Sequence, residues 1–365
     1  MSKTNLISLR ASMAAFVIFL AAALVPAAAG AAPAAQDNEP AQAQLKIKPF
    51  GIHKGKAKIT KIVSIGGSLA PYRKGQHVRV FFYNDGKKVK ASRVKVKKGD
   101  GNYGTFKAKI GTREGKKYAV QARYYGQAGN DPVSKDHTVR KSWKVKYVSL
   151  SHGQCSSVVK GFRKALNELK LVPSQGKCFD GQMDRAVLAY RKLNNFNRNS
   201  RANKTIVKRI FNGKGGYHVR RPELGVHVEA PLSRQVIVFA KGDKPYAIFP
   251  IASGKPSTPT ILGTFSFYMK TPGYNSHGMY YSSYFIRGYA IHGYAEVPDY
   301  PASHGCLRTF IADQPRIYEM TEYGMPIYVF GDARSINGGF GSADAGPGSG
   351  PDLGPTGGLN PAVPD

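Results

Sequence analysis

The 365-residue chain is poor in cysteine, in acidic residues and in long apolar runs. Only three cysteines are present, and no CxxC pair, HExxH sequence or carboxylate cluster accompanies them, so no metal site is expected. Asp and Glu number 22 against 54 Lys and Arg, which gives a formal net charge of +32. Beyond the first forty residues no stretch is apolar enough to span a bilayer.

Residues 1–40 have the pattern of a secretory signal peptide followed by a linker. Lys3 and Arg10 precede the apolar run from Ala11 to Val25, and the Ala/Gly/Pro stretch after Pro26 offers small-x-small cleavage sites. No cysteine lies near the end of the apolar run, which argues against a lipid-modified lipoprotein. The sequence therefore predicts export, with an uncleaved membrane anchor as the alternative.

Two short motifs lie close together near the C-terminal end. YAIHGY spans residues 289–294, and SHGCLR spans residues 303–308, so that Cys306, two histidines and an arginine fall within seventeen residues. A cysteine attacks a carbonyl as thiolate, and its ordinary pKa of about 8.5 leaves it mostly protonated at neutral pH. A neighbouring imidazole takes the proton and later returns it to a leaving amine. The pattern indicates a thiol acyltransferase.

These motifs resemble the active-site signature of the L,D-transpeptidase catalytic domain of bacterial cell-wall enzymes. The resemblance implies that Cys306 is the nucleophile and that His292 is the base, oriented by the carbonyl of Gly293. It also makes His304 a catalytic candidate, although a purely structural role for His304 in supporting the loop stays open. A buried strand histidine at His292 and a metal site formed by Cys306 and the two histidines stay open as well.

The resemblance implies further contacts with the substrate. Gly305 lets the backbone turn tightly and bring amide groups to a developing oxyanion. Arg308 grips a carboxylate in fork fashion, and Ser303 shapes the site. Tyr281 and Tyr284 belong to a tyrosine cluster before His292, and either line the substrate cleft or pack the sheet.

The remaining two cysteines have a different explanation. Cys155 follows Ser151-His152-Gly153-Gln154, a sequence similar to the motif above but with an extra residue before the cysteine. It lies 23 residues before Cys178, and a disulfide that closes this loop contributes about 3 kcal/mol by the chain-entropy estimate. The pairing leaves Cys306 as the odd thiol, which in an exported protein is a reactive candidate.

Charge and periodicity divide the chain into parts. The net charge is +22 for residues 41–150, +11 for 151–216 and +1 for 217–332. Short alternating strands predict an immunoglobulin-like β-sandwich over 45–150. Two apolar stripes and a third short helix over 151–215 resemble a peptidoglycan-binding-like helical module, with a plain helical spacer as the alternative. Strands return over the catalytic domain at 216–332, and a Gly/Pro-rich tail at 333–365 is expected to be disordered.

The expected fold class is therefore multidomain and mostly β. The resemblance implies a peptidoglycan acyltransferase that forms 3→3 cross-links between stem peptides, needs no metal or organic cofactor, and is acylated by carbapenems. An L,D-carboxypeptidase, a sortase-like transpeptidase and a non-catalytic wall-binding protein are the competing functions. The basic front parts predict anionic wall polymers as partners, or serve solubility alone. Nucleic acid is not expected, because no helix-turn-helix, finger or RNP-like motif is present.

Overall fold

The computed structural model describes residues 43–125, 137–171 and 176–333. The predicted signal peptide and linker lie outside these ranges, as does the predicted disordered tail apart from its first residue. None of the helices in the described ranges has the length and apolar character that crossing a bilayer requires.

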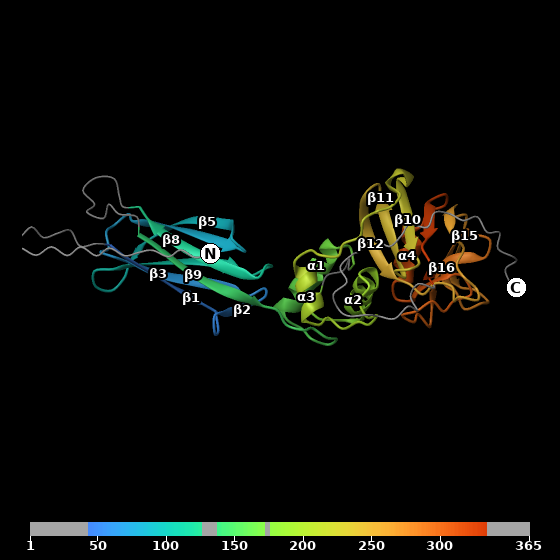
Figure 1. Cartoon of the computed structure of the whole chain (residues 1–365), viewed down its shortest axis with the longest axis horizontal. Helices are drawn as coiled ribbons and strands as arrows, with labels where there is room; N and C mark the ends of the chain where they lie inside the picture. The colour runs from blue at the N-terminus through green and yellow to red at the C-terminus, as the bar shows by residue number, and fades with distance from the viewer. Residues whose placement is uncertain (1–42, 126–136, 172–175, 334–365) are drawn as a thin grey trace, which may run out of the picture. The chain divides into compact units, whose positions relative to one another are not determined.

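The first part of the described chain consists of two antiparallel-rich sheets whose apolar faces share one core (Figure 1). Valines, leucines and aromatics at alternate positions, such as Val80, Val120 and Trp143, are buried between the sheets, while lysines and arginines occupy the positions between them. One sheet has the order β1 (Gln44–Phe50), β3 (Ile62–Ala70), β7 (Gly104–Gly111), β6 (Lys97–Lys98). The other has the order β2 (Lys56–Lys58), β9 (His137–Lys146), β8 (Lys117–Tyr124), β4 (His77–Asn84), β5 (Lys87–Lys95).

The turn between β4 and β5 follows its predicted chemistry. Asp85 and Gly86 both have positive φ, at 46° and 87°. Two such residues form the turn whose twist suits a two-residue hairpin, and Asp-Gly tolerates it best. The Asp85 carboxylate also accepts hydrogen bonds from the backbone amides of Lys116 and Lys117, which fastens the hairpin to β8.

Three helices follow, and each begins at a polar side chain that accepts a hydrogen bond from a first-turn amide. The caps are Ser156, Asp180 and Asn203. The disulfide between Cys155 and Cys178 is present, as the sequence predicted. The helices are α1 (Ser157–Glu168), α2 (Gly181–Leu193) and α3 (Lys204–Phe211).

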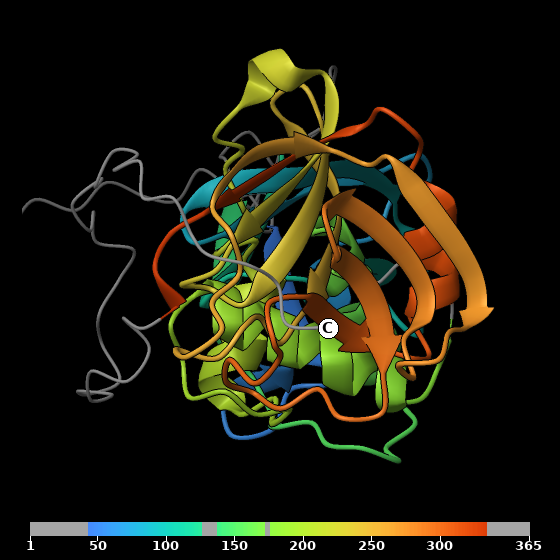
Figure 2. The same cartoon turned by 90° about the vertical axis from the view of Figure 1, so that its right-hand side faces the viewer.

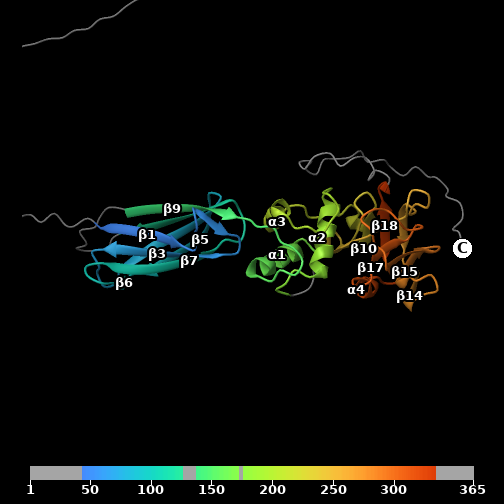
Figure 3. The same cartoon turned by 90° about the horizontal axis from the view of Figure 1, so that it is seen from below.

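The last part contains two further sheets and one helix. A 3-10 turn at Pro222–Leu224 leads into the first sheet, of order β12 (Lys244–Pro250), β11 (Val236–Lys241), β10 (Val226–Pro231), β18 (Pro326–Phe330), β13 (Gly263–Ser266). The second has the order β14 (Met269–Tyr274), β15 (Tyr280–Ile286), β16 (Tyr289–Tyr294), β17 (Leu307–Phe310), and both can be followed in Figure 3. The helix α4 (Gln314–Met320) packs beside β15 and β16 (Figure 2).

The helices and the last part share a hydrophobic core. Val236, Val238 and Ile248 of β11 and β12 belong to the same buried cluster as the apolar faces of the three helices. The mostly β fold class with several sheets is confirmed, as is a β-rich catalytic domain. The division into modules at residues 150 and 215 stays a prediction.

Candidate active site

Cys306 lies immediately before β17, at the edge where β17 pairs with β16 in parallel. Its Sγ is 3.6 Å from the carbonyl oxygen of Gly288, and the side chain is half-buried. Burial raises the pKa of the Cys306 thiol, which the nearby Ala290 backbone and the charge of Arg308 partly offset. The resting sulfur is therefore a neutral thiol at pH 7.

His292 lies on β16, the strand next to Cys306. Its Nδ1 is 3.0 Å from the Gly293 carbonyl oxygen, which is the orienting contact that the resemblance implied. A carbonyl only accepts, so Nδ1 carries the hydrogen and Nε2 has the free lone pair. Burial, and to a smaller extent the charge of Arg308, lower the pKa of His292 to about 4. The imidazole is thus neutral at pH 7, in the form that accepts a proton.

The parallel pairing of β16 and β17 places His292 directly opposite Arg308. The Arg308 guanidinium lies 4.1 Å from the centroid of the Tyr294 ring, a cation–π distance that fixes its direction. Its backbone exchanges two hydrogen bonds of 2.9 Å with Ala252. In the described structure no hydrogen bond joins Cys306 Sγ to the His292 ring, so the two groups share adjacent strands without direct contact. Catalytic hydrogen bonds are often long in unliganded sites.

The loop before Cys306 is held by its own side chains. Ser303 is buried, and its hydroxyl donates to the Cys306 carbonyl at 2.6 Å and accepts from the Gly305 amide at 3.0 Å. Gly305 has φ +123°, and a Cβ there would lie 2.4 Å from the Tyr289 ring. Its carbonyl accepts a hydrogen bond from Thr260. Ser303 therefore shapes the loop, and the Gly305 amide is already bonded within it.

His304 lies apart from the other candidates. Its side chain is exposed, and its Nε2 accepts a hydrogen bond from the Lys255 ammonium at 3.1 Å. Residue 304 alternates with Ser303 and Gly305, both buried, so its side chain points to the opposite side of the loop. The contacts of His304 are those of a loop support.

The tyrosine candidates lie on β15 and are half-buried. Tyr281 has a positive φ of 49° and packs edge-on against Tyr280 and Tyr318, with centroid distances of 4.7 and 5.0 Å. The Tyr284 hydroxyl accepts a hydrogen bond from Asn275 at 3.2 Å. Both rings thus contact neighbouring side chains of the sheet and leave part of their surface exposed.

Two residues that sequence reasoning missed complete the surroundings of His292. Thr309 donates from its hydroxyl to the His292 carbonyl at 3.1 Å. The Gln314 side-chain oxygen bonds the same hydroxyl, and its amide donates to the Tyr281 carbonyl at 2.6 Å and to the Ile291 carbonyl at 3.4 Å. Both side chains are fully buried. The only signal in the sequence was their position just after the cysteine motif.

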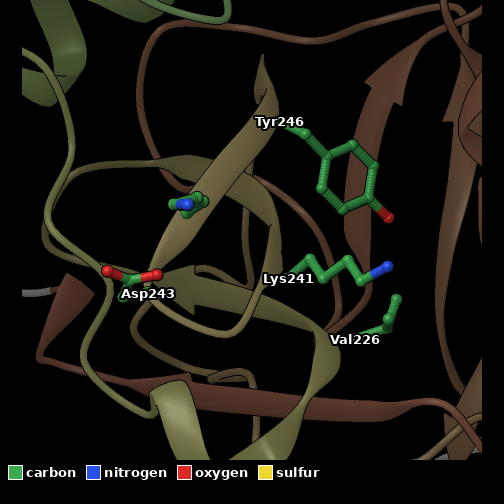
Figure 4. A pocket seen from close by; sticks show the side chains of 5 residues that line it. Val226, Lys241, Asp243 and Tyr246 are labelled. Atoms are coloured by element: carbon green, nitrogen blue, oxygen red, sulfur yellow. The ribbon is translucent and has the colours of Figure 1, made fainter.

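A separate pocket lies on the β10–β12 side of the domain, lined by Val226, Lys241, Asp243, Lys244 and Tyr246 (Figure 4). None of the residues singled out from the sequence lines it. Within the described ranges, no three His, Cys, Asp or Glu side chains come together in a way that would hold a metal ion.

Fold and site together define a β-rich domain with a half-buried thiol beside a neutral, tautomer-fixed histidine. Residues 225–329 match the YkuD family, the L,D-transpeptidase catalytic domain, so this part of the chain is an L,D-transpeptidase catalytic domain. The match begins one residue before β10 and includes every site residue described above. No curated protein sequence is significantly similar to the chain.

Several solved structures are similar to parts of the chain. The L,D-transpeptidase of Xylanimonas cellulosilytica (residues 123–326) shows 22% identity and a TM-score of 0.47, and the similarity covers 51% of this chain and 98% of that one. An L,D-transpeptidase from Stackebrandtia nassauensis shows 19% identity and a TM-score of 0.32, over 51% and 98%. The catalytic domain of the Enterococcus faecium enzyme shows 28% identity and a TM-score of 0.26, over 29% and 96%.

Proposed function

We propose that this protein is an L,D-transpeptidase that forms 3→3 cross-links between peptidoglycan stem peptides through a thioester on Cys306. The family match at residues 225–329 supports a transpeptidase-type activity. The observation that carries the assignment of residues is the state of His292, neutral at pH 7 and with Nε2 free, on the strand beside the cysteine.

In the proposed first step, His292 Nε2 takes the thiol proton as Cys306 Sγ attacks the carbonyl of the diamino acid that precedes a terminal D-Ala. The C–N bond to D-Ala breaks, the proton returns to the leaving amine, and a thioester remains. The raised pKa of the thiol and the lowered pKa of the imidazole both favour a neutral pair at rest. Proton transfer therefore accompanies attack, in contrast to a preformed thiolate–imidazolium pair.

In the second step an amine from a neighbouring stem attacks the thioester, forms the new amide bond and releases the thiol, again through His292. Water in place of the amine gives an L,D-carboxypeptidase product. Arg308 is placed to pair with a substrate carboxylate, because its guanidinium is fixed over Tyr294 beside His292. His304 lies on the other side of the loop and has no assigned proton-transfer step.

Peptidoglycan lies outside the plasma membrane, so the same proposal places the protein there and makes residues 1–40 its export signal. Anionic wall polymers are part of it as partners of the basic front part of the chain, where the net charge is +22 over residues 41–150.

The test is intact-mass spectrometry of the full chain after carbapenem treatment, together with D-Ala release from a tetrapeptide stem. We expect one covalent adduct on the native protein, none on Cys306→Ala, and release of D-Ala by the native protein alone. A native protein without adduct, or an equal adduct on Cys306→Ala, would contradict the proposal. Addition of an acceptor stem separates dimer formation from hydrolysis.

His292→Gln tests the base. It should retain the fold and lose about 10²–10⁴-fold in the rate of D-Ala release. The matched control is His304→Gln, which should lose less than about tenfold because its ring contacts Lys255 and neither Cys306 nor His292. Equal losses in both variants would remove the distinction between the two histidines.

A further inference from the structure

The two outer faces of the β-sandwich are both basic, but they carry different residues. On the sheet β2-β9-β8-β4-β5, the strand positions that alternate with the buried core hold Arg79, Arg93, Arg123 and Arg140, which we call the arginine face. On the other sheet, the outward positions of β1 and β7 hold Lys46, Lys48, Lys107 and Lys109. Four of the six arginines between residues 43 and 150 are thus gathered on one face.

Three of these arginines form a row across adjacent strands. Arg79 of β4 is the direct register partner of Arg93 on β5 and of Arg123 on β8. Strands lie about 4.8 Å apart, and like charges directly opposite one another destabilise a sheet. The five strands of this sheet contain no Asp or Glu, so none of their own side chains neutralises the row. Like charges in register are a feature that an anionic ligand would relieve.

Aromatic rings lie among these cations. The Arg79 guanidinium is 5.2 Å from the centroid of the Tyr125 ring, and the Arg140 guanidinium is 5.2 Å from the Tyr83 ring. The Tyr83 hydroxyl shares a hydrogen bond of 2.9 Å with the Gln121 side chain between them. Tyr125 is 47% exposed and Tyr83 is half-buried, so both rings present apolar surface next to the charges.

We propose that the arginine face binds an acidic polysaccharide, with carboxylates of successive sugars on the Arg93–Arg79–Arg123 row. The guanidinium fork matches a carboxylate with two parallel hydrogen bonds, which a lysine does not, and this accounts for arginine on this face and lysine on the other. The apolar C–H faces of sugar rings pack on the negative faces of Tyr83 and Tyr125. The positive row and the rings together favour a charged glycan over a polyanion without sugar rings.

The arginine face is independent of the catalytic assignment, because it includes no residue of the 225–329 domain. Its test uses the full chain and polygalacturonate, a polymer of uronic acid, in titration calorimetry at about 0.15 M salt, where surface charges are screened beyond about 8 Å. We compare Arg79→Gln/Arg93→Gln/Arg123→Gln with Lys46→Gln/Lys107→Gln/Lys109→Gln, which loses the same charge from the opposite face.

We expect the arginine variant to lose at least about tenfold in affinity and the lysine control to stay within about twofold of the native protein. Absence of binding by the native protein, or equal losses in both variants, overturns the proposal in favour of non-specific charge attraction. The arginine variant should melt at the native temperature or above it, since it removes like charges in register. D-Ala release from a soluble tetrapeptide should be unchanged in both variants, which separates this result from any failure of the proposed catalysis.

Polyphosphate is the competing probe. Tighter binding of polyphosphate than of polygalacturonate to the arginine face would overturn the glycan assignment in favour of a phosphate polymer. The variant Tyr83→Ala/Tyr125→Ala separates the two chemistries further, because it should weaken the glycan and leave polyphosphate unchanged. Dextran, a neutral glycan, should not bind.

Discussion

At the scale of single residues, the surroundings of His292 keep its ring uncharged. The residue is only 3% exposed, and the positive Arg308 lies opposite it on the neighbouring strand. Both effects disfavour a second proton. Because the folded pKa is about 4 and that of a free histidine is about 6.5, the unfolded chain binds the proton more readily between these values.

The unfolding free energy should therefore fall as the pH is lowered from 7 to 4. The contribution of His292 to this loss is about 3 kcal/mol, since each pKa unit corresponds to about 1.4 kcal/mol. Urea titrations of the native protein and of His292→Gln at several pH values measure it as the difference between the two slopes. Parallel curves for the two proteins would refute a buried, neutral histidine.

Gly305 has a backbone conformation and a neighbour that both exclude a side chain. At φ +123° an L-residue is strained, and a Cβ would lie 2.4 Å from the Tyr289 ring. Gly305→Ala should lose well over about 2 kcal/mol of unfolding free energy and shift the loop that carries Cys306. Gly242→Ala is the control, because it also has positive φ, at 56°, but nothing within 4 Å of the added carbon. It should lose only about 1–2 kcal/mol, and equal losses in chemical denaturation would exclude the steric explanation.

At the scale of elements, the first residue of α4 connects three strands of the catalytic sheet. Gln314 bonds the Tyr281 carbonyl after the start of β15, the Ile291 carbonyl on β16 and the Thr309 hydroxyl on β17. Gly293 faces it so closely that an added Cβ would lie 3.0 Å from the Gln314 side chain. The helix thus sets the spacing of the strands that carry His292 and Arg308.

Gln314→Met keeps the volume and leaves these buried polar groups unsatisfied. We expect a loss of about 2–3 kcal/mol in unfolding free energy, and a slower release of D-Ala because β16 and β17 lose their common support. The exposed Arg316→Met on the same helix should stay within about 0.5 kcal/mol of the native protein. Urea denaturation and a stem-peptide assay measure both effects, and a neutral Gln314→Met would show that the network adds nothing.

At the scale of the whole described chain, two polar contacts join the helical part to the catalytic domain. Arg185 of α2 makes a two-pronged ion pair with Asp313, at 2.6 and 2.7 Å, directly before Gln314. Lys192 of α2 is fully buried and donates to the Ile251 carbonyl at 2.7 Å. Together with the shared apolar cluster, these contacts make the helices part of the support of the active-site domain.

Burial lowers the pKa of Lys192 to about 7, against about 10.4 for a free lysine. Between these values the unfolded chain binds the proton more readily, so the unfolding free energy should rise by about 2 kcal/mol from pH 7 to pH 9. Lys192→Met should lack this rise. Denaturant titrations at the two pH values measure the difference, and an equal rise in both proteins would count against a buried amine.

The sequence predicted the fold class, the catalytic domain and the disulfide because each depends on local patterns. Alternating apolar residues predict strands, i/i+3/i+4 spacing predicts helices, and the motif around Cys306 is contiguous in the chain. The third helix was predicted from residue 202 and begins at Lys204, a difference explained by Asn203, whose side chain caps it. Helix ends depend on single capping residues, which periodicity does not reveal.

The candidate site was less predictable, because contacts there depend on pairing between distant strands. Ser303 was expected to contact substrate and instead bonds the loop, while Thr309 and Gln314 had no signal before the register of β16 and β17 was known. The arginine face has the same origin. Arg79, Arg93 and Arg123 are separated by 14 or more residues in the sequence, and strand pairing alone brings them into one row.

Local chemistry along the chain was thus sufficient for the identity of the elements, the reactive thiol and the family of the catalytic domain. The protonation of His292, the use of the Gly305 amide, the support by α4 and the charge row on the sandwich required the folded chain. The physical reason is that pKa values, buried hydrogen bonds and like-charge contacts depend on which atoms lie within a few ångströms, and folding brings together atoms from separate parts of the sequence.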